Sequence, residues 1–165
     1  KDGNVSAIKL EVNGDTEKLM KQLKKLQHID KKGISTAMAE ALRESTVSRF
    51  EAEQTPDGGQ WKKSIRASSG GKTLTQTARL KNSIHAKAEE EGFAVGTNTI
   101  YAATHQFGAQ RTIRAKSGGM LKFKVNGVWR QAKEVTINVP ARPFLGMSDQ
   151  DQQEIQGILE DAMAE

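Results

Sequence analysis

The chain has 165 residues, of which 36% are hydrophobic, 5% are aromatic and none is cysteine. This length suits a single domain with its own core, and the lack of cysteine excludes disulfides, thiolate metal sites and cysteine nucleophiles. No apolar run approaches the length of a membrane-spanning helix, and the polar start has no signal-peptide pattern, so we expect a cytosolic protein that does not enter a membrane. The chain does not open on methionine, which leaves open whether the native N-terminus is present.

The net charge of +5 conceals a strong segregation of charge. Residues 1–59 carry 10 basic and 10 acidic side chains, residues 60–133 carry 14 and 3, and residues 134–165 carry 1 and 7. A basic part and an acidic part favour head-to-tail association between copies or contact with nucleic acid. The alternative is two solvated faces that meet no partner. The low content of apolar and aromatic residues also suggests that another subunit completes part of the core.

The N-terminal third contains one predicted strand and two predicted helices. Residues 7–12 (AIKLEV) alternate between apolar and polar side chains, as in a half-buried strand. Leucines then recur at helical spacing over residues 16–29, with Asp15 as a plausible N-cap. Gly33 breaks that pattern before residues 34–50, the longest predicted helix. One side of this helix holds Ile34, Met38, Ala41 and Leu42.

The middle of the chain alternates turns with short elements. Residues 55–59 (TPDGG) and 68–73 (SSGGKT) are predicted turns, because proline presets its φ angle and glycine tolerates positive φ. The second turn resembles a phosphate-binding loop only superficially, since Arg66 stands where GxxxxGK[ST] requires glycine. Residues 74–84 predict a short helix that leads into a strand, and residues 93–98 predict the next strand.

The clearest hairpin signal lies in residues 120–139. Asn126-Gly127 is the commonest kind of two-residue turn and separates two alternating runs. The apolar positions of the first run are Leu121, Phe123 and Val125, and the basic positions between them are Lys122 and Lys124. This alternation predicts a hairpin with one apolar face and one positive face.

A last helix is predicted over residues 148–163, and its acidic first turn suits the helix dipole. Its apolar stripe holds Ile155, Ile158, Leu159 and Ala162. In chain order the elements predict an α+β fold, an antiparallel sheet with a long β-hairpin packed against several helices. We expect residues 1–165 to form one domain, with residues 109–139 as a basic β-hairpin extension.

Residues 101–110 (YAATHQFGAQ) raise the question of catalysis, because His105 stands among polar and aromatic neighbours. A histidine general base needs a nucleophile and an orienting carboxylate, yet no Asp or Glu occurs between Asn98 and Met120. The histidines also lack the spacing of a metal site. The favoured interpretation is an amphipathic turn of helix that ends at Gly108. Its inward side is predicted to hold Ile100, Ala103, Thr104 and Phe107.

Residues 139–148 (VPARPFLGMS) contain Pro140 and Pro143, each of which keeps the residue before it out of a helix. Arg142 is held between the prolines, and Phe144 follows. A rigidly held arginine and aromatic ring suit an interface. The alternative is a strand-to-helix connector that packs on its own core, and both interpretations stay open.

The positive charge of the hairpin and its lead-in loop forms a second candidate surface. Such charge can follow a phosphate backbone, but the segment has no recognised nucleic-acid-binding motif. We therefore expect at most sequence-independent contact with DNA. The candidate residues are Arg111, Arg114, Lys116, Lys122, Lys124 and Arg130.

Four phrases, in this order, resemble the phage virion morphogenesis family, the tail completion proteins of Mu-like and P2-like contractile-tailed phages. The phrases are GGQWKKS (58–64), LTQTARLKNSI (74–84), VGTNTIYAATHQFG (95–108) and VPARPFLGMSDQD (139–151). The resemblance covers residues 35–162, and HQFG and ARPFLG are its most specific parts. One departure is Ala78, because the family commonly has glycine there.

The resemblance implies a structural, late virion assembly protein of the phage neck and not an enzyme, with no cofactor and no metal. Such proteins complete the tail end or the head–tail junction, and related proteins assemble as rings, often hexamers. The implied partners are other copies, the tail tube or tail terminator, head-side connector proteins and genomic DNA in transit. The implied location is the virion neck, after assembly in the host cytoplasm.

Two alternatives remain: a non-specific DNA-binding module and a hydrolase that depends on His105. We expect the assembly interface to include Trp61, Tyr101, His105, Gln106, Phe107, Arg142, Pro143 and Phe144. The hairpin strands carry more lysine than arginine. Because arginine suits fixed contacts with carboxylates, this excess of lysine predicts that the hairpin lines or borders the channel.

Overall fold

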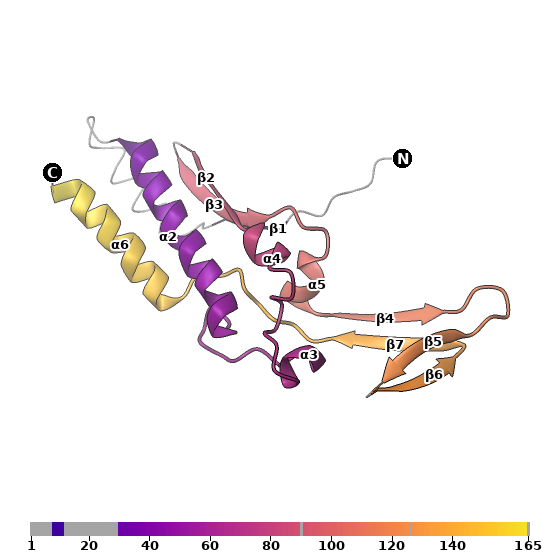
Figure 1. The fold of residues 1–165 in the computed structure, drawn as a ribbon. Helices are drawn as coiled ribbons and strands as arrows, with labels where there is room; N and C mark the ends of the chain where they lie inside the picture. The colour runs from indigo at the N-terminus through magenta and orange to yellow at the C-terminus, as the bar shows by residue number, and fades with distance from the viewer. Residues whose placement is uncertain (1–7, 12–29, 90, 126, 165) are drawn as a thin grey trace.

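The computed structural model describes residues 8–11, 30–89, 91–125 and 127–164. Two long helices lie side by side next to a small sheet, and a long arm built from two pairs of strands projects from the other end (Figure 1). The predicted α+β class is therefore confirmed. The strand predicted over residues 7–12 is found as β1 (Ile8–Glu11), whereas the helix predicted over residues 16–29 lies outside the described residues.

The longest helix, α2 (Lys31–Ala52), begins earlier than its sequence pattern predicts. Asp30 is its N-cap and accepts a hydrogen bond from the Gly33 amide at 2.9 Å, which satisfies one of the free amides of the first turn. Gly33 thus lies inside the helix and does not break it. The helix ends where Glu53 turns into the left-handed region, with φ 55°.

The sheet beside α2 is antiparallel, with the strand order β1-β3-β2. β2 (His85–Glu89) and β3 (Gly92–Thr97) form a hairpin, and β1 pairs with the other edge of β3. The short helix α4 (Arg79–Asn82) leads into β2, as predicted. Because β3 is the central strand, Val95 is fully buried against α2.

Two apolar clusters hold the body together. The larger one joins α2 to the sheet and to residues 144–145, and it includes Leu42, Phe50 and Phe144. The smaller one packs α2 against the last helix, α6 (Asp149–Ala164), through Met38 and Leu159. The predicted stripe of α6 is confirmed, since Ile155 and Leu159 are buried and Ile158 and Ala162 are partly buried.

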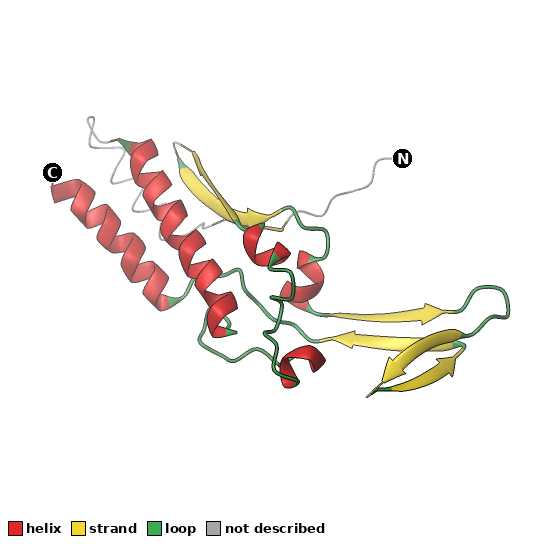
Figure 2. Ribbon diagram, viewed as in Figure 1, coloured by secondary structure: helices red, strands yellow, loops and turns green. Residues whose placement is uncertain are grey.

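Residues 109–139 form the projecting segment, which we call the arm. It consists of β4 (Ala109–Arg114) paired with β7 (Glu134–Val139), and of β5 (Leu121–Val125) paired with β6 (Val128–Ala132) (Figure 2). The register Val125↔Val128 confirms the predicted hairpin. The expected loop around Arg111 and Arg114 is wrong, because both residues lie in β4. The predicted return strand is also divided, since β6 and β7 are separate strands.

Two short helices complete the described fold. No pattern in the sequence predicted α3 (Ile65–Ser68). The helix α5 (Ala102–Phe107) was predicted, but the side chains assigned to its inward face were wrong. Phe107 is 70% exposed and Ile100 is 73% exposed, whereas Ala102 is fully buried. In a helix this short, apolar spacing covers less than two turns and does not fix which side meets the core. None of the helices in the described part of the chain is long and apolar enough to cross a membrane.

Candidate interaction surfaces

The two most specific sequence phrases, HQFG and ARPFLG, lie against each other in the fold. The side-chain oxygen of Gln106 accepts hydrogen bonds from the backbone amides of Phe144 and Leu145, both at 3.0 Å. The Gln106 amide group donates to the Leu145 carbonyl at 2.9 Å, and the Arg142 amide donates to the His105 carbonyl at 2.7 Å. The side chain of Gln106 therefore satisfies backbone amides and a carbonyl of residues 144–145 in the way that a neighbouring strand would. We call this set of contacts the brace.

Gly108 allows the two phrases to approach this closely. It has φ 75° and ψ 168°, a combination open almost only to glycine. A Cβ atom at this position would lie 2.8 Å from the Ala141 nitrogen and 2.9 Å from the Val139 oxygen. The glycine predicted as a helix C-cap is found there, and it also admits the strand-to-helix connector.

The aromatic part of the ARPFLG phrase is inside the subunit. The Phe144 ring is fully buried, with ring centroids 5.3 Å from Phe50, which in turn lies 5.4 Å from Trp61. The Trp61 indole N–H donates to the Pro143 carbonyl at 2.8 Å. Of the two interpretations left open by sequence, the structure shows the connector that packs on its own core. The expectation that Phe144 is displayed for a partner is wrong for the isolated subunit.

Arg142 is also buried, at 6% exposure. Its guanidinium Nε donates to the Lys62 carbonyl at 2.6 Å, and burial lowers its pKa. This arginine is therefore not displayed at the surface of the subunit either. Trp61, Arg142 and Phe144 are thus buried within the subunit, whereas Pro143 is partly exposed. The interface role of this group stays a prediction.

A buried ion pair joins α2 to α6, and sequence reasoning did not find it. The Arg49 guanidinium donates to Asp151 and to the carbonyls of Phe144 and Gly146, the latter two at 3.0 and 2.8 Å. Burial alone would raise the pKa of Asp151, but hydrogen bonds from Ser148 and Ser45 and the charge of Arg49 together hold it below its usual value. The available signal was an arginine on the apolar side of α2.

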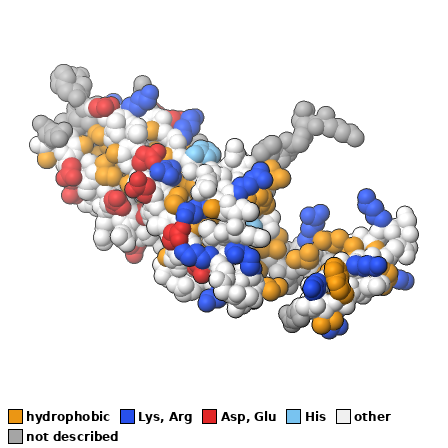
Figure 3. Space-filling view, viewed as in Figure 1, with side chains coloured by type: hydrophobic (Ala, Val, Ile, Leu, Met, Phe, Trp, Pro, Cys, Tyr) orange, Lys and Arg blue, Asp and Glu red, His pale blue; other side chains and the backbone are white. Residues whose placement is uncertain are grey.

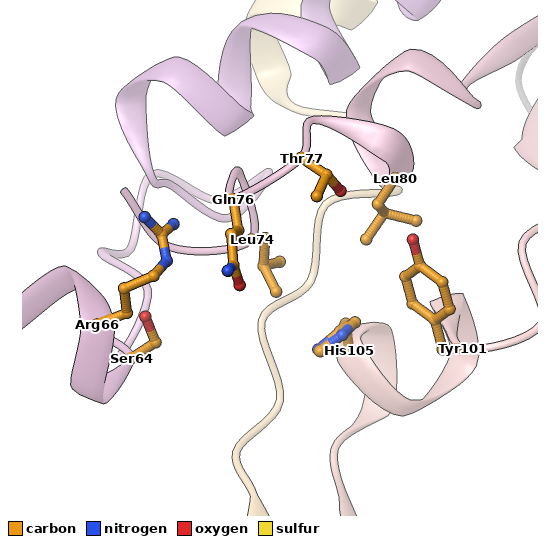
Figure 4. Close-up of a pocket in the computed structure, with 8 residues that line it drawn as sticks. All are labelled: Ser64, Arg66, Leu74, Gln76, Thr77, Leu80, Tyr101 and His105. Carbon is orange, nitrogen blue, oxygen red and sulfur yellow. The ribbon is translucent and has the colours of Figure 1, made fainter. Parts of the chain in front are cut away.

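His105 of α5 and Tyr101, the residue that caps the start of α5, line a pocket of about 320 Å³ (Figure 4). The two rings stack edge to face, with centroids 5.8 Å apart. Other lining residues come from α3, from α4 and from the segment that leads into α4. The full lining is Ser64, Arg66, Leu74, Gln76, Thr77, Leu80, Tyr101 and His105.

The chemistry of this pocket does not favour general base catalysis. Burial, and then the positive charge of Arg142, lower the pKa of His105 and so make its imidazole a weaker base. No Asp or Glu occurs among the lining residues to orient the imidazole. Within the described residues, Nδ1 of His105 is buried without a hydrogen-bond partner. The described residues also contain no group of His, Cys, Asp and Glu that could hold a metal ion.

Each half of the arm has two chemically different faces, because residues directly opposite in an antiparallel pair share a face. In β4–β7, the polar face carries the Thr112–Thr136 hydroxyl contact at 3.0 Å and the Arg114–Glu134 ion pair at 3.0 Å. The opposite, apolar face consists of Ala109, Arg111, Ile113, Val135, Ile137 and Val139.

The β5–β6 half repeats this division. Its apolar face consists of Leu121, Phe123, Val125, Val128, Arg130 and Ala132. Its other face places Lys122 opposite Gln131, and Lys124 opposite Trp129. The predicted separation of apolar and basic positions is therefore confirmed. The strand register adds Trp129, 70% exposed, to the basic face.

Comparison with known proteins places these features in a family. Residues 13–164 match the model of the phage virion morphogenesis family. The chain is 30% identical over 134 residues to protein G of Escherichia phage Mu, whose name gives it a provisional role in capsid assembly; the match covers 75% of this chain and 74% of that protein. It is 27% identical over 153 residues to tail completion protein S of Escherichia phage P2, covering 87% and 91%.

A third relative is the Mu-like prophage FluMu G protein 2 of Haemophilus influenzae, 30% identical over 129 residues that cover 78% of this chain and 75% of the relative. No solved structure shows a significant match. The matching family is one of structural proteins and not of enzymes. The matched region contains both halves of the brace and the whole arm. The chain therefore belongs to the phage virion morphogenesis family.

Proposed function

We propose that this protein is a ring-forming subunit of the phage neck, which completes the tail end or the head–tail junction. Family membership and the similarity to a tail completion protein support a role in virion assembly. The ring, the neck and the channel are our proposal. The partners would be other copies in a hexamer, the tail tube or tail terminator, and head-side connector proteins.

The observation that carries the proposal is the exposure of the arm. Among the described residues, ten large hydrophobic side chains are exposed, and six of them lie in the arm. They are Ile113, Met120, Val125, Val128, Trp129 and Ile137. Two-stranded ribbons are marginally stable by themselves in water, and exposed apolar groups on this scale mark sites of association. An arm of this composition is best explained as an assembly element.

The basic face of the arm suits a channel for DNA. Lys122 and Lys124 project from the same face of β5 and are both exposed. Lysine provides positive charge without the fixed geometry that reads bases, so it permits passage of any sequence. We therefore propose that this face lines or borders the lumen. Arg114 and Lys116 lie further along the arm and would add to the positive lining.

The main experiment is to measure the mass of the protein in solution by light scattering and to image it by negative stain. We expect a closed ring with a central hole. Strong, salt-dependent DNA binding by a monomer would instead support the alternative function of a non-specific DNA-binding module. A monomer that does not bind DNA would contradict both functions. A ring with Lys122 and Lys124 on its outer circumference would refute the lumen assignment alone.

A further inference from the structure

Two of the three arginines of the arm lie on its apolar faces, and the third, Arg114, is paired with Glu134 on the polar face of β4–β7. Arg111 lies on the apolar face of β4–β7, directly opposite Ile137, and Arg130 lies on the apolar face of β5–β6, directly opposite Phe123. The other face of β5–β6 carries lysine. Arginine is the cation enriched in protein interfaces, because its planar guanidinium binds carboxylates through two parallel hydrogen bonds. The apolar faces thus have the composition of an interface that meets acidic groups.

An acidic surface lies at the opposite end of the molecule. Helix α6 has five acidic residues and no basic ones. One of them, Asp151, is buried in the ion pair with Arg49. The other four are exposed: Asp149, Glu154, Glu160 and Asp161. Figure 3 shows acidic side chains gathered over the helical end, and lysine and arginine along the arm. Met163, 41% exposed, adds an apolar group to the same helix.

We propose that the arm of one subunit docks, through its apolar faces and their two arginines, on the acidic surface of α6 in a second copy of this chain. The two surfaces are complementary in charge, but they lie at opposite ends of one subunit and cannot meet within it (Figure 1). The contact joins two different surfaces, and its head-to-tail repetition closes into a ring or grows into a filament. This inference rests on the proposed ring and names the surfaces that build it.

The docking also accounts for the presence of both kinds of cation. The arginines would be buried between subunits with the apolar residues, while Lys122 and Lys124 on the other face would remain free to line the channel. One hairpin would thus serve the contact with one face and the lumen with the other. The arm carries seven basic residues and one acidic residue, so steering between subunits should weaken with salt.

The test uses charge reversal on each surface of the full chain. Arg111→Glu with Arg130→Glu should abolish the ring, and so should Glu154→Lys with Asp161→Lys. The two acidic positions are one heptad apart and share a helix face. When the two double variants are mixed, the intact arm of one fits the intact α6 of the other, and the two reversed surfaces attract each other as well, so light scattering should show mixed rings that neither variant forms alone. A chain that carries all four changes should recover rings.

The matched control is Lys32→Glu with Lys63→Glu, which changes the net charge as much as the arm variant but at exposed positions on the body. It should leave the ring intact. If the wild type forms rings and both reversals leave their mass unchanged, the docking is refuted while the proposed function stands. A monomeric wild type would refute both. If a reversal variant lacks the wild-type circular dichroism, Arg111→Gln with Arg130→Gln takes its place and should also lose the ring.

Discussion

Replacement of Gln106 tests whether the brace is an internal support or an assembly contact. Gln106→Met keeps the length of the side chain but removes its three hydrogen bonds to residues 144 and 145. A neutral hydrogen bond contributes about 0.5–1.5 kcal/mol, so the loss of three should lower the free energy of unfolding by about 1.5–4.5 kcal/mol. Gln106→Glu can still accept from both backbone amides, but its second oxygen faces the Leu145 carbonyl, so it should also be destabilised at neutral pH and less so at acid pH, where a protonated carboxyl group can donate.

The assay is urea unfolding followed by tryptophan fluorescence, because Trp61 lies beside the braced segment. Unfolding should be measured over a series of protein concentrations, since assembly adds to apparent stability. Phe107→Ala is the neighbouring control. Because Phe107 is 70% exposed, its loss should change the free energy of unfolding by less than about 0.5 kcal/mol. A Gln106→Met protein with the wild-type urea midpoint would refute the internal brace.

Three further substitutions test single features of the fold. Ala78 has φ 53°, a left-handed conformation that costs a non-glycine residue about 1–2 kcal/mol, so Ala78→Gly should raise the midpoint of thermal unfolding. Gly108→Ala should destabilise the protein by at least about 1–3 kcal/mol, measured in the same way, because the added methyl group also meets backbone atoms of residues 139 and 141. Asp151→Asn should cost about 3–5 kcal/mol at neutral pH, since it leaves Arg49 buried without its counter-charge. The folded-state pKa of Asp151 is depressed. The stabilisation by its carboxylate is therefore present above the ordinary Asp pKa and is lost as the pH falls through the folded-state value. In urea titrations at several pH values, the free energy of unfolding of Asp151→Asn should fall less steeply with acidification than that of the wild type.

Local patterns predicted the elements whose contacts are close in sequence. The Asn-Gly turn identified the β5–β6 hairpin, and apolar spacing over several turns identified α2 and α6. β4 was missed because its partner is β7, on the far side of a whole hairpin, and no nearby turn announces that pairing. Ala78 stands where the family commonly has glycine. The left-handed turn that suits glycine is nevertheless formed at Ala78.

The candidate surfaces were predicted less well than the elements, for a related reason. Trp61, Arg142 and Phe144 are residue types that often anchor interfaces. Residue type alone does not tell whether a side chain packs against a partner or against the core of its own subunit. Phe107 shows the opposite error, since an apolar side chain in a short helix was assigned to the core and is exposed. The position of Arg111 on the apolar face of the arm required the strand register, which depends on the unpredicted β4–β7 pairing.

The brace lies at the base of the arm, so a small change in the brace changes the position of the far end of the arm. The arm leaves the body at Gly108 and returns at Pro140, and the backbone at both points is held by the contacts of residues 105–108 with residues 139–145. The six residues of β4 reach about 20 Å at about 3.3 Å per residue, so a tilt of about 6° at the root moves the far end of that strand by about 2 Å. Such a shift separates a guanidinium from a carboxylate. Small errors in the angle of the arm would also add up from subunit to subunit around a ring. The few hydrogen bonds of Gln106 would therefore decide how accurately the last subunit meets the first and closes the ring.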